Sequence, residues 1–435
     1  MARRSDVLSW TVARGKPLTG TLDVPPDKSI THRALLLGAI ARGTTRIVNG
    51  LAGADCLATR AALEALGVSV RLEGPDWLVE GQGLEAWHEA GDVLDAGNSG
   101  TTMRLLSGLL VGVPGLHVLS GDGSLRARPM ARIVEPLRAM GARITGRRGG
   151  RLAPLVIEGT ALTGVDHPAP VASAQVKSAL LLAGLRARGE TRVFEPVPSR
   201  DHTERMLLAM GASLRREGQT WCLTGGGELH GGDVTVPGDV SSAMFWIVAA
   251  TLVPGSDCLL RNVGLNPTRT GGLDVLRAMG ADLTVLNERV VSGEPVGDLR
   301  VRSAHLRGSL IAGGLVPRLL DEIPVLALAA ACAEGTTVVR DAADLRAKES
   351  DRLQTIAREL GALGARVAET PDGLVIEGGG RLAGGEATSH GDHRIAMMAA
   401  IAGLVADRPV RIEDVSCVGT SYPGFESELR PWIIG

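Results

Sequence analysis

Clusters of polar residues recur just before apolar segments of this 435-residue chain. The clusters are Lys28-Ser29, Asn98-Ser99-Gly100-Thr101, Ser173-Ala174-Gln175, Ser241-Ser242, Asp321-Glu322 and His390-Gly391-Asp392-His393-Arg394. Side chains of these types commonly cap the first turn of a helix. Exposed amides at a helix N-terminus also attract anions. Because the pattern occurs six times, we predict that several helix N-termini converge on a site for anionic ligands.

Basic residues accompany these clusters. Lys28, Arg33, Arg104, Lys177 and Arg394 lie in or near the first turns, and two loops, residues 125–129 and 345–352, add more. Such residues can form either a solvated face with local ion pairs or an anion-binding site. For the basic residues of these two loops, both possibilities remain open at this point.

A partial repeat of half the chain favours chemistry at Lys28. Val24-Pro25-Pro26-Asp27-Lys28-Ser29 resembles Val236-Pro237-Gly238-Asp239-Val240-Ser241, 212 residues later. The second copy has Val240 where the first has Lys28, so the turn does not need a lysine to form. We therefore predict that Lys28 serves binding or catalysis.

Two carboxylates lie among these cations. Asp321 precedes an apolar segment, and Glu349 stands between Lys348 and Arg352. A carboxylate at a helix start also suits simple capping. Among cations, however, it favours the ionised form and can take a proton from a bound hydroxyl. Asp321 and Glu349 are therefore our candidates for acid–base catalysis.

The elements that position these residues form a repeat. Six apolar, Ala/Leu-rich helices are predicted from about Arg33, Met103, Lys177, Ala243, Ile323 and Arg394. The strands that follow are predicted near Arg46, His117, Arg192, Leu259, Val338 and Arg411. The repeat length is about 73 residues, so six repeats fill the chain.

A second helix in most repeats ends in a glycine. Gly67, Gly141, Gly211 and Gly280 follow helical segments and precede predicted strands. A left-handed cap at such a helix end favours glycine. Proline-containing segments near residues 25 and 237 are expected where the chain crosses between lobes. We predict an α/β (α+β type) fold with two similar lobes, residues 26–238 and residues 1–25 plus 239–435.

Composition excludes several classes of function. The net charge of −2 and the ten aromatic residues argue against a nucleic-acid or carbohydrate-binding module. The five scattered cysteines predict neither a disulfide framework nor a cysteine zinc site. No apolar run reaches the length of a membrane helix, and residues 1–6 do not look like a signal peptide. We expect a cytoplasmic protein.

Motifs for other chemistries are absent or weak. The sequence has no P-loop, no strand-linked G-x-G-x-x-G and no nucleophile elbow. His390 and His393, with Asp392, are compatible with part of a metal site or with hydrogen-bonding roles. We favour hydrogen bonding because no carboxylate-rich partner motif accompanies them.

Seven motifs together resemble the 5-enolpyruvylshikimate-3-phosphate synthase family of enolpyruvyl transferases. They are D-K-S-I-T-H-R (from Asp27), G-N-S-G-T-T-M-R (Gly97), L-R-A-R-P-M (Leu125), S-A-Q-V-K-S-A (Ser173), D-E-I-P (Asp321), L-R-A-K-E-S-D-R (Leu345) and D-H-R-I-A-M (Asp392). They occur in family order and span nearly the whole chain.

The resemblance implies transfer of the enolpyruvyl group of phosphoenolpyruvate to the 5-hydroxyl of shikimate 3-phosphate, with release of phosphate, by addition and elimination in an interlobe cleft. It also implies two lobes, each of three βαβ-type repeats with the helices packed inside, as in an inside-out α/β barrel. From the resemblance we expect a monomer that uses no cofactor or metal and binds neither nucleic acid nor membrane.

The family's site residues carry over by motif. Asp321 is implied as the acceptor of the hydroxyl proton, Glu349 as a participant in proton transfer to the methylene carbon, and Lys28 as a further catalytic group. Shikimate 3-phosphate would be held by Lys28, Ser29, Arg33, Ser173, Ala174, Gln175, Arg200, Asp321 and Lys348. Phosphoenolpyruvate would be held by Lys28, Asn98, Gly100, Thr101, Arg128, Gln175, Arg352 and Arg394.

The sequence departs from the family pattern at two positions. Thr420 stands where many members have a lysine, and Ala174 stands where many have a serine. The related UDP-N-acetylglucosamine enolpyruvyl transferases share the repeat fold but have a cysteine in the loop before A-R-P, which residues 121–126 lack. That activity and a non-catalytic anion-binding scaffold are the alternatives.

Overall fold

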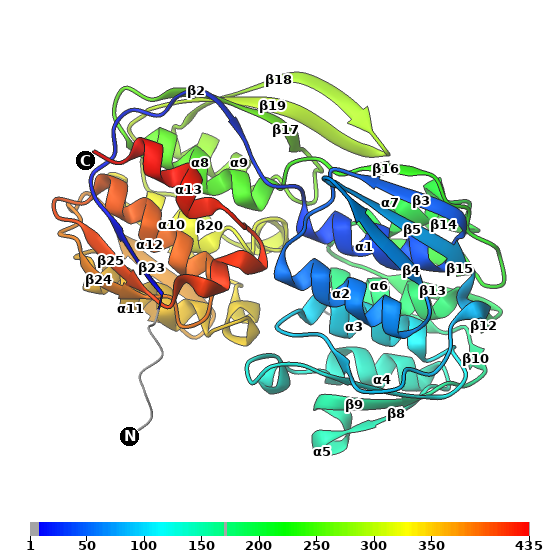
Figure 1. Cartoon of the computed structure of the whole chain (residues 1–435). Helices are drawn as coiled ribbons and strands as arrows, with labels where there is room; N and C mark the ends of the chain where they lie inside the picture. The colour runs from blue at the N-terminus through cyan, green and yellow to red at the C-terminus, as the bar shows by residue number, and fades with distance from the viewer. Residues whose placement is uncertain (1–7, 169–171, 435) are drawn as a thin grey trace. The chain divides into compact units, whose positions relative to one another are not determined.

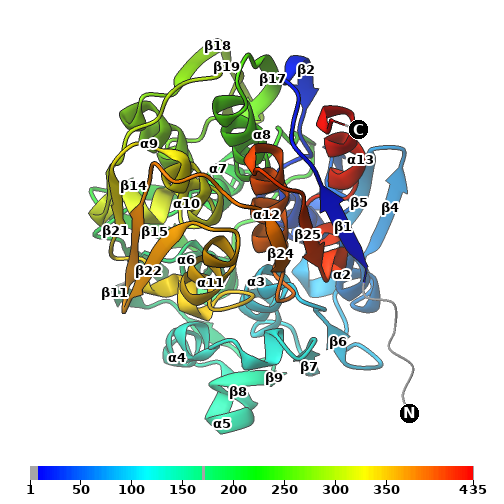
Figure 2. The same ribbon diagram turned by 90° about the vertical axis from the view of Figure 1, so that its left-hand side faces the viewer.

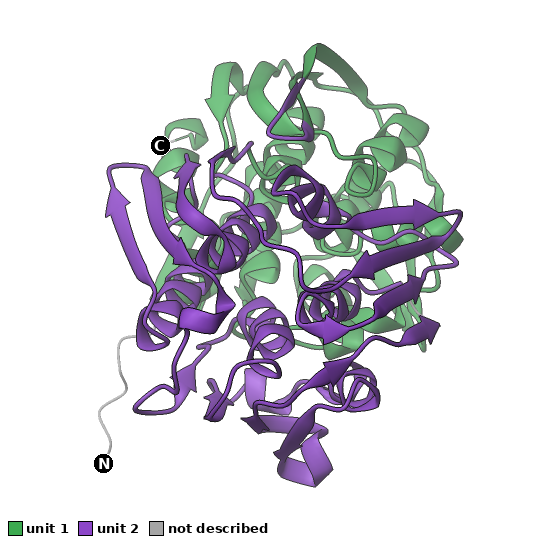
Figure 3. Ribbon diagram, turned by 90° about the vertical axis from the view of Figure 1, so that its right-hand side faces the viewer, with its two compact units in different colours: residues 1–25, 238–289, 295–435 green, residues 26–237, 290–294 purple. Residues whose placement is uncertain are grey.

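The computed structural model describes residues 8–168 and 172–434, so the expectation about a signal peptide at residues 1–6 falls outside the described residues. The chain divides into two compact units (Figure 3). Unit 1 comprises residues 1–25, 238–289 and 295–435, and unit 2 comprises residues 26–237 and 290–294. The lobes expected from the sequence differ from these units in placing residues 290–294 with residues 239–435, and the lobe boundaries stay a prediction.

Three repeats are continuous in sequence and share one topology. A strand leads into a buried helix, a parallel strand, a second helix and an antiparallel hairpin, as the order β6-β7-β9-β8 shows. The second repeat contains β6 (Leu94–Asp95), α3 (Gly100–Leu110), β7 (Leu116–Ser120), α4 (Ala131–Ala139), β8 (Arg143–Gly146) and β9 (Leu152–Glu158). The third contains β11 (Asp166–Pro168), α6 (Ala174–Gly184), β13 (Glu190–Phe194), α7 (His202–Ala209), β14 (Leu214–Glu217) and β15 (Thr220–Thr224). The fifth contains β20 (Leu310–Ile311), α10 (Ile323–Cys332), β21 (Thr336–Val339), α11 (Arg352–Ala362), β22 (Arg366–Thr370) and β23 (Gly373–Glu377).

The first and fourth repeats take their parallel strand from distant sequence. The first repeat has α1 (Lys28–Ile40), β3 (Arg42–Val48), α2 (Ala54–Ala65), β4 (Ser69–Glu73) and β5 (Asp76–Gln82), and β16 (Asp233–Thr235) pairs with β3. The fourth has α8 (Val240–Leu252), β17 (Asp257–Gly264), α9 (Gly271–Met279), β18 (Asp282–Val291) and β19 (Glu294–Arg302), and β2 (Thr19–Asp23) pairs with β17. In each unit, a strand distant in sequence thus completes the sheet: β16 in unit 2 and β2 in unit 1.

The sixth repeat lacks the hairpin of the others. Its sheet consists of β24 (Gly385–Thr388), β25 (Val410–Glu413) and the N-terminal β1 (Ser9–Val12), which lie side by side in Figure 2. Its helix is α12 (His393–Val405), and α13 (Phe425–Leu429) follows. The remaining short elements are β10 (Leu162–Thr163), β12 (Ala187–Arg188), α5 (Arg147–Gly150), η1 (Leu84–Ala86), η2 (Leu125–Ala127), η3 (Gly313–Arg318), η4 (Ala343–Ala347), η5 (Val415–Thr420) and η6 (Arg430–Trp432).

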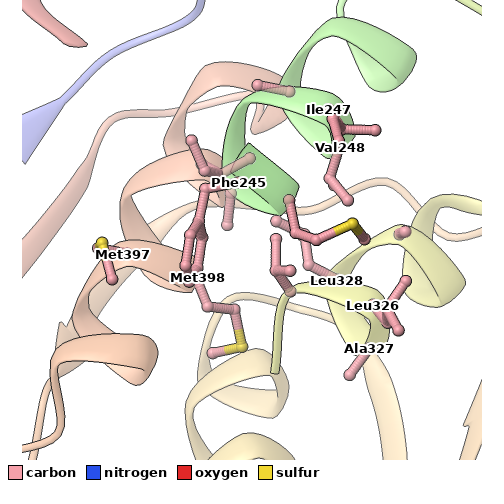
Figure 4. Close-up of a cluster of buried hydrophobic side chains, with 14 of the residues drawn as sticks. Phe245, Ile247, Val248, Leu326, Ala327, Leu328, Met397 and Met398 are labelled. Carbon is pink, nitrogen blue, oxygen red and sulfur yellow. The ribbon is translucent and has the colours of Figure 1, made fainter. Parts of the chain in front are cut away.

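The six predicted apolar helices are confirmed as α1, α3, α6, α8, α10 and α12. Nearly all of their residues are buried, because a helix that is apolar on every face needs cover on every face. In unit 2, α1, α3 and α6 lie inside the sheets (Figure 1). In unit 1, Phe245 and Val248 of α8, Leu326 of α10 and Met398 of α12 meet in one apolar cluster (Figure 4).

The predicted strands and glycine caps are also confirmed. The strands are β3, β7, β13, β17, β21 and β25. Gly67, Gly141, Gly211 and Gly280 have φ between 94° and 101°, the left-handed region in which glycine avoids the steric cost of a Cβ. No helix in the described residues combines the length and apolar character needed to cross a membrane.

Candidate active site

In unit 2, the first turns of α3 and α6 are joined by hydrogen bonds. Arg104 Nη1 donates to Gln175 Oε1 at 2.6 Å, and Gln175 Nε2 donates to Thr101 Oγ1 at 3.2 Å. Ser99 caps α3 by accepting from the Thr102 amide at 3.0 Å. The starts of these two helices therefore lie together, while convergence of all six helix N-termini stays a prediction.

Lys28, the first residue of α1, forms an ion pair with a residue that the sequence did not single out. Its Nζ lies 2.8 Å from Asp55 Oδ2, and the two side chains are 15% and 8% exposed. Asp55 is in the first turn of α2, where an acidic residue is expected for helix stability alone, so its sequence position gave no separate signal.

Arg33 lies deeper in the same helix, and three partners fix its guanidinium. Nε donates to Thr203 Oγ1 at 2.7 Å, Nη2 to Ser178 Oγ at 3.2 Å and Nη1 to the Ser29 carbonyl at 2.9 Å. These bonds join α1 to α6 and α7. A rigid, charged fork of this kind suits recognition of a phosphate or carboxylate.

Gly100 begins α3 beside two guanidinium groups. A Cβ at this position would lie 2.8 Å from Arg104 Nη1 and 3.2 Å from Arg128 Nη1. Arg128 is buried, and its Nη2 donates to Asn98 Oδ1. The absence of a side chain thus leaves room at a point where a helix N-terminus meets positive charge.

The remaining predicted residues of unit 2 lie at helix starts. Ser173 is the N-cap residue of α6, although its side chain makes no capping hydrogen bond, and Ala174 is the first residue of that helix. Arg200 lies two residues before α7 and is partly buried. Lys177 differs from the prediction: it is buried and pairs with Glu195 and Glu204, so it adds no uncompensated positive charge.

In unit 1, Arg352 forms ion pairs with three carboxylates. Its guanidinium lies 3.0 Å from Asp321 Oδ1, 2.6 Å from Glu349 Oε2 and 2.8 Å from Asp392 Oδ2. Burial alone would lower the pKa of Arg352, but the charges of Asp392, Glu349 and Asp321 together raise it above its usual value. Both candidate acid–base residues are therefore held by one permanently charged arginine.

Asp321 accepts from a second cation as well. Lys348 Nζ lies 3.1 Å from the same Oδ1 that Arg352 contacts. Lys348 follows η4, Arg352 begins α11 and Asp321 precedes α10, so residues from two chain segments meet at one carboxylate oxygen. The motif that begins at Asp321 and the motif of residues 345–352 are thus in contact.

Arg394 occupies the first turn of α12. It is only 6% exposed, yet within residues 8–168 and 172–434 its guanidinium has neither a hydrogen-bond acceptor nor a carboxylate partner. A buried cation without a counter-ion is costly. An anionic ligand would compensate this charge.

The two histidines before and in α12 make hydrogen bonds or pack in the interior. His390 Nε2 lies 2.7 Å from Glu359 Oε1, and His393 is buried. Among the residues that the structure describes, no group of three or more His, Cys, Asp and Glu side chains is arranged to hold a metal ion.

Three of the five cysteines are poorly suited to act as nucleophiles. All five are free thiols, as predicted. Burial raises the pKa of Cys258, Cys332 and Cys417 to about 12, which keeps these thiols protonated at neutral pH.

Comparison with known proteins decides the family. The model of the family described as EPSP synthase (3-phosphoshikimate 1-carboxyvinyltransferase) matches residues 12–429. The chain belongs to the EPSP synthase family. Proteins named 3-phosphoshikimate 1-carboxyvinyltransferase from Desulforudis audaxviator and Gloeobacter violaceus are each 56% identical to it, over 97% of this chain and 98% of theirs.

Solved structures of the EPSP synthase family agree. An EPSP synthase structure from Acinetobacter baumannii matches with a TM-score of 0.85 and 46% identity, covering 97% of each chain. The predicted family, the two-lobed α/β fold class and the class of enzyme, an enolpyruvyl transferase of the shikimate pathway, are thereby confirmed. The comparisons do not favour the UDP-N-acetylglucosamine alternative.

Proposed function

We propose that this chain transfers the enolpyruvyl group of phosphoenolpyruvate to the 5-hydroxyl of shikimate 3-phosphate and releases inorganic phosphate. The observation that carries the proposal is the arrangement at Arg352, which holds Asp321 and Glu349 within 3.0 Å of one guanidinium. Membership of the EPSP synthase family supports the same reaction.

We assign the two substrates to the residues described above. Phosphoenolpyruvate carries a carboxylate and a phosphate, and both suit bidentate arginines and helix N-termini. Its proposed ligands are Lys28, Asn98, Gly100, Thr101, Arg128, Gln175, Arg352 and Arg394. The proposed ligands of shikimate 3-phosphate are Lys28, Ser29, Arg33, Ser173, Ala174, Gln175, Arg200, Asp321 and Lys348.

The proposed addition step forms one C–O bond. The methylene carbon of phosphoenolpyruvate gains a proton, a transfer in which Glu349 takes part. The neighbouring carbon then accepts the substrate's 5-hydroxyl oxygen, and Asp321 takes the hydroxyl proton. Lys28 and the arginines stabilise the charge that develops on the substrates.

The proposed elimination step restores the double bond. The new methyl group returns a proton to Glu349, and the bond between the adjacent carbon and the phosphate oxygen breaks. Phosphate leaves with the electron pair, so atoms and charge balance across the two steps. The chain's residues supply all the proton transfers in this scheme.

A paired substrate assay tests the proposal. Purified protein should release phosphate with phosphoenolpyruvate and shikimate 3-phosphate but not when UDP-N-acetylglucosamine replaces the latter. Asp321→Asn should lower kcat by about 10²–10⁴-fold, the usual range for a general base, while binding of shikimate 3-phosphate persists. Asp407→Asn, a change at an exposed residue of the same unit, is the control.

Phosphate release with UDP-N-acetylglucosamine alone as acceptor would refute the assignment. We also propose that the enzyme works as a cytoplasmic monomer and binds small molecules rather than nucleic acid or membrane. Sedimentation of the purified protein at a mass near 45.2 kDa would support the monomer.

A further inference from the structure

A buried ionic cluster lies beside the proposed shikimate 3-phosphate ligands of unit 2. Lys177 is two residues after Gln175 on α6, and its side chain is 1% exposed. Its Nζ lies 2.7 Å from Glu195 Oε2 and 2.6 Å from Glu204 Oε1, and both carboxylates are also buried. Apolar residues often stabilise a core as well as such a cluster does, so stability alone does not explain three charged groups here.

Glu195 fixes the end of the segment that connects β13 to α7. Its Oε1 accepts from the Ser199 amide at 3.1 Å and from the Ser199 hydroxyl, while Oε2 contacts Lys177. Lys177 Nζ also donates to the Ser199 carbonyl at 3.5 Å. Both backbone polar groups of Ser199, the residue before Arg200, are therefore tied to the cluster.

The first turn of α7 is held in a similar way. His202 Nδ1 lies 2.7 Å from Glu294 Oε1, Thr203 Oγ1 accepts from Arg33 Nε at 2.7 Å, and Glu204 meets Lys177. All three residues of the turn are buried. A shift of this turn would move the Thr203 oxygen that orients Arg33.

We propose that Lys177, Glu195 and Glu204 are positioning residues for shikimate 3-phosphate, which hold residues 199–203 where Arg200 and Arg33 bind that substrate. This inference rests on the proposed function. The cluster contacts no substrate in this scheme. It acts through Ser199 on one side and through Thr203 on the other.

The two glutamates differ in what they hold. Both oxygens of Glu195 accept hydrogen bonds, whereas Glu204 Oε2 has no hydrogen-bond partner among the described residues. Burial raises the pKa of Glu204, although Lys177 opposes the shift, so a neutral group fits this position. The same Glu→Gln change should therefore have unequal effects.

The test compares Glu195→Gln with Glu204→Gln. In Glu195→Gln, the amide nitrogen must face either Lys177 or the two Ser199 donors, so the segment loosens. We expect its Kd for shikimate 3-phosphate, measured by calorimetry, to rise about tenfold, which corresponds to about 1.4 kcal/mol. The KM for this substrate should rise likewise with little change in kcat. Glu204→Gln, whose amide oxygen can still accept from Lys177, should raise the Kd and the KM by a smaller factor than Glu195→Gln does. Arg200→Ala gives the reference for loss of the ligand itself.

Hydrogen exchange of the substrate-free protein provides a separate measurement. Amides of residues 199–203 should exchange faster in Glu195→Gln than in Glu204→Gln. Ser199→Ala removes only the hydrogen bond from the Ser199 hydroxyl to Glu195 and leaves the three charged groups in place. It should show a smaller rise in the Kd and a smaller increase in exchange, and it replaces Glu195→Gln as the test if that variant does not fold. Equal losses of thermal stability in the two glutamate variants, with an unchanged Kd and KM, would overturn the inference. If the wild type itself does not bind shikimate 3-phosphate, the proposed function fails, and the exchange data still decide whether the cluster holds the segment.

Discussion

The first turns of α1 in unit 2 and α8 in unit 1 have the same backbone but different chemistry. Asp27 and Asp239 cap the two helices with φ and ψ of −62° and 117°, and of −70° and 115°. The next residue is Lys28 in α1, paired with Asp55, and Val240 in α8, which is buried in the core. The comparison shows that the repeat determines the cap, while the side chain after the cap is free to serve a ligand or the core.

Unit 1 takes its proposed cationic ligands from other helices. Lys348 and Arg352 flank the start of α11, and Arg394 is in the first turn of α12. Arg352 is 1% exposed and contacts three carboxylates, whereas Lys28 is 15% exposed and pairs with Asp55. We therefore expect Arg352 to contribute more to the stability of the fold than Lys28.

Arg352→Met should have the largest effect. Three carboxylates would lose their shared guanidinium, and breaking a buried pair costs about 3–5 kcal/mol. We expect a clearly lower thermal midpoint in calorimetry and a loss of phosphate release of about 10³-fold or more, since proton transfer and substrate binding both depend on this group. Arg358→Met, at an exposed arginine of α11, is the control. A wild-type midpoint for Arg352→Met would refute the structural half of the comparison.

Lys28→Met should affect catalysis more than folding. Asp55 loses its ion-pair partner, at a cost of about 1–3 kcal/mol, while we expect kcat/KM to fall about 10²–10³-fold. The double variant Lys28→Met with Asp55→Asn should recover stability but not activity, and exposed Lys16→Met should change neither. Steady-state phosphate release and thermal midpoints separate the two effects. Recovery of activity in the double variant would show that Lys28 serves structure only.

The sequence predicted the repeat better than it predicted the pairing of side chains. Apolar helices such as α8 and glycine caps such as Gly280 follow from local patterns, because burial on every face and a positive φ each restrict residue type. Asp55 was missed because its partner Lys28 is 27 residues away and nothing local marks the pair. Lys177 was placed among the anion-binding cations because its two carboxylate partners lie on other elements.

Gly100→Ala should have a moderate effect, confined to one substrate. Position 100 begins α3, whereas the corresponding helix of unit 1, α10, begins with the buried Ile323. An alanine Cβ would approach Arg104 Nη1 at 2.8 Å and press on Arg128, so both guanidinium groups must shift. We expect the KM for phosphoenolpyruvate to rise about tenfold, or about 1.4 kcal/mol, with little change in the Kd for shikimate 3-phosphate. Equal effects on both substrates would contradict the assignment of Gly100 to phosphoenolpyruvate.

His32→Met should have the smallest effect and introduces into unit 2 the residue type found at the equivalent position of unit 1, Met244. Burial, with Lys28 and Arg33 nearby, lowers the pKa of His32 well below its ordinary value of 6.5. Below about pH 6.5 the unfolded chain therefore binds a proton that the folded chain does not. As the pH is lowered, this group decreases the free energy of unfolding by at most about 1.4 kcal/mol per pH unit.

When the pH is lowered from 7.5 to 5.5, the thermal midpoint of the variant should thus decrease less than that of the wild type. Part of the slope should remain, since burial also lowers the pKa of His117. At pH 7.5 the cost should be small, because Thr59 loses the 2.7 Å bond to His32 but keeps its 2.7 Å contact with Thr102. Calorimetry at three or four pH values tests this prediction. If the thermal midpoint of His32→Met depends on pH as steeply as that of the wild type, His32 does not cause the loss of stability in acid.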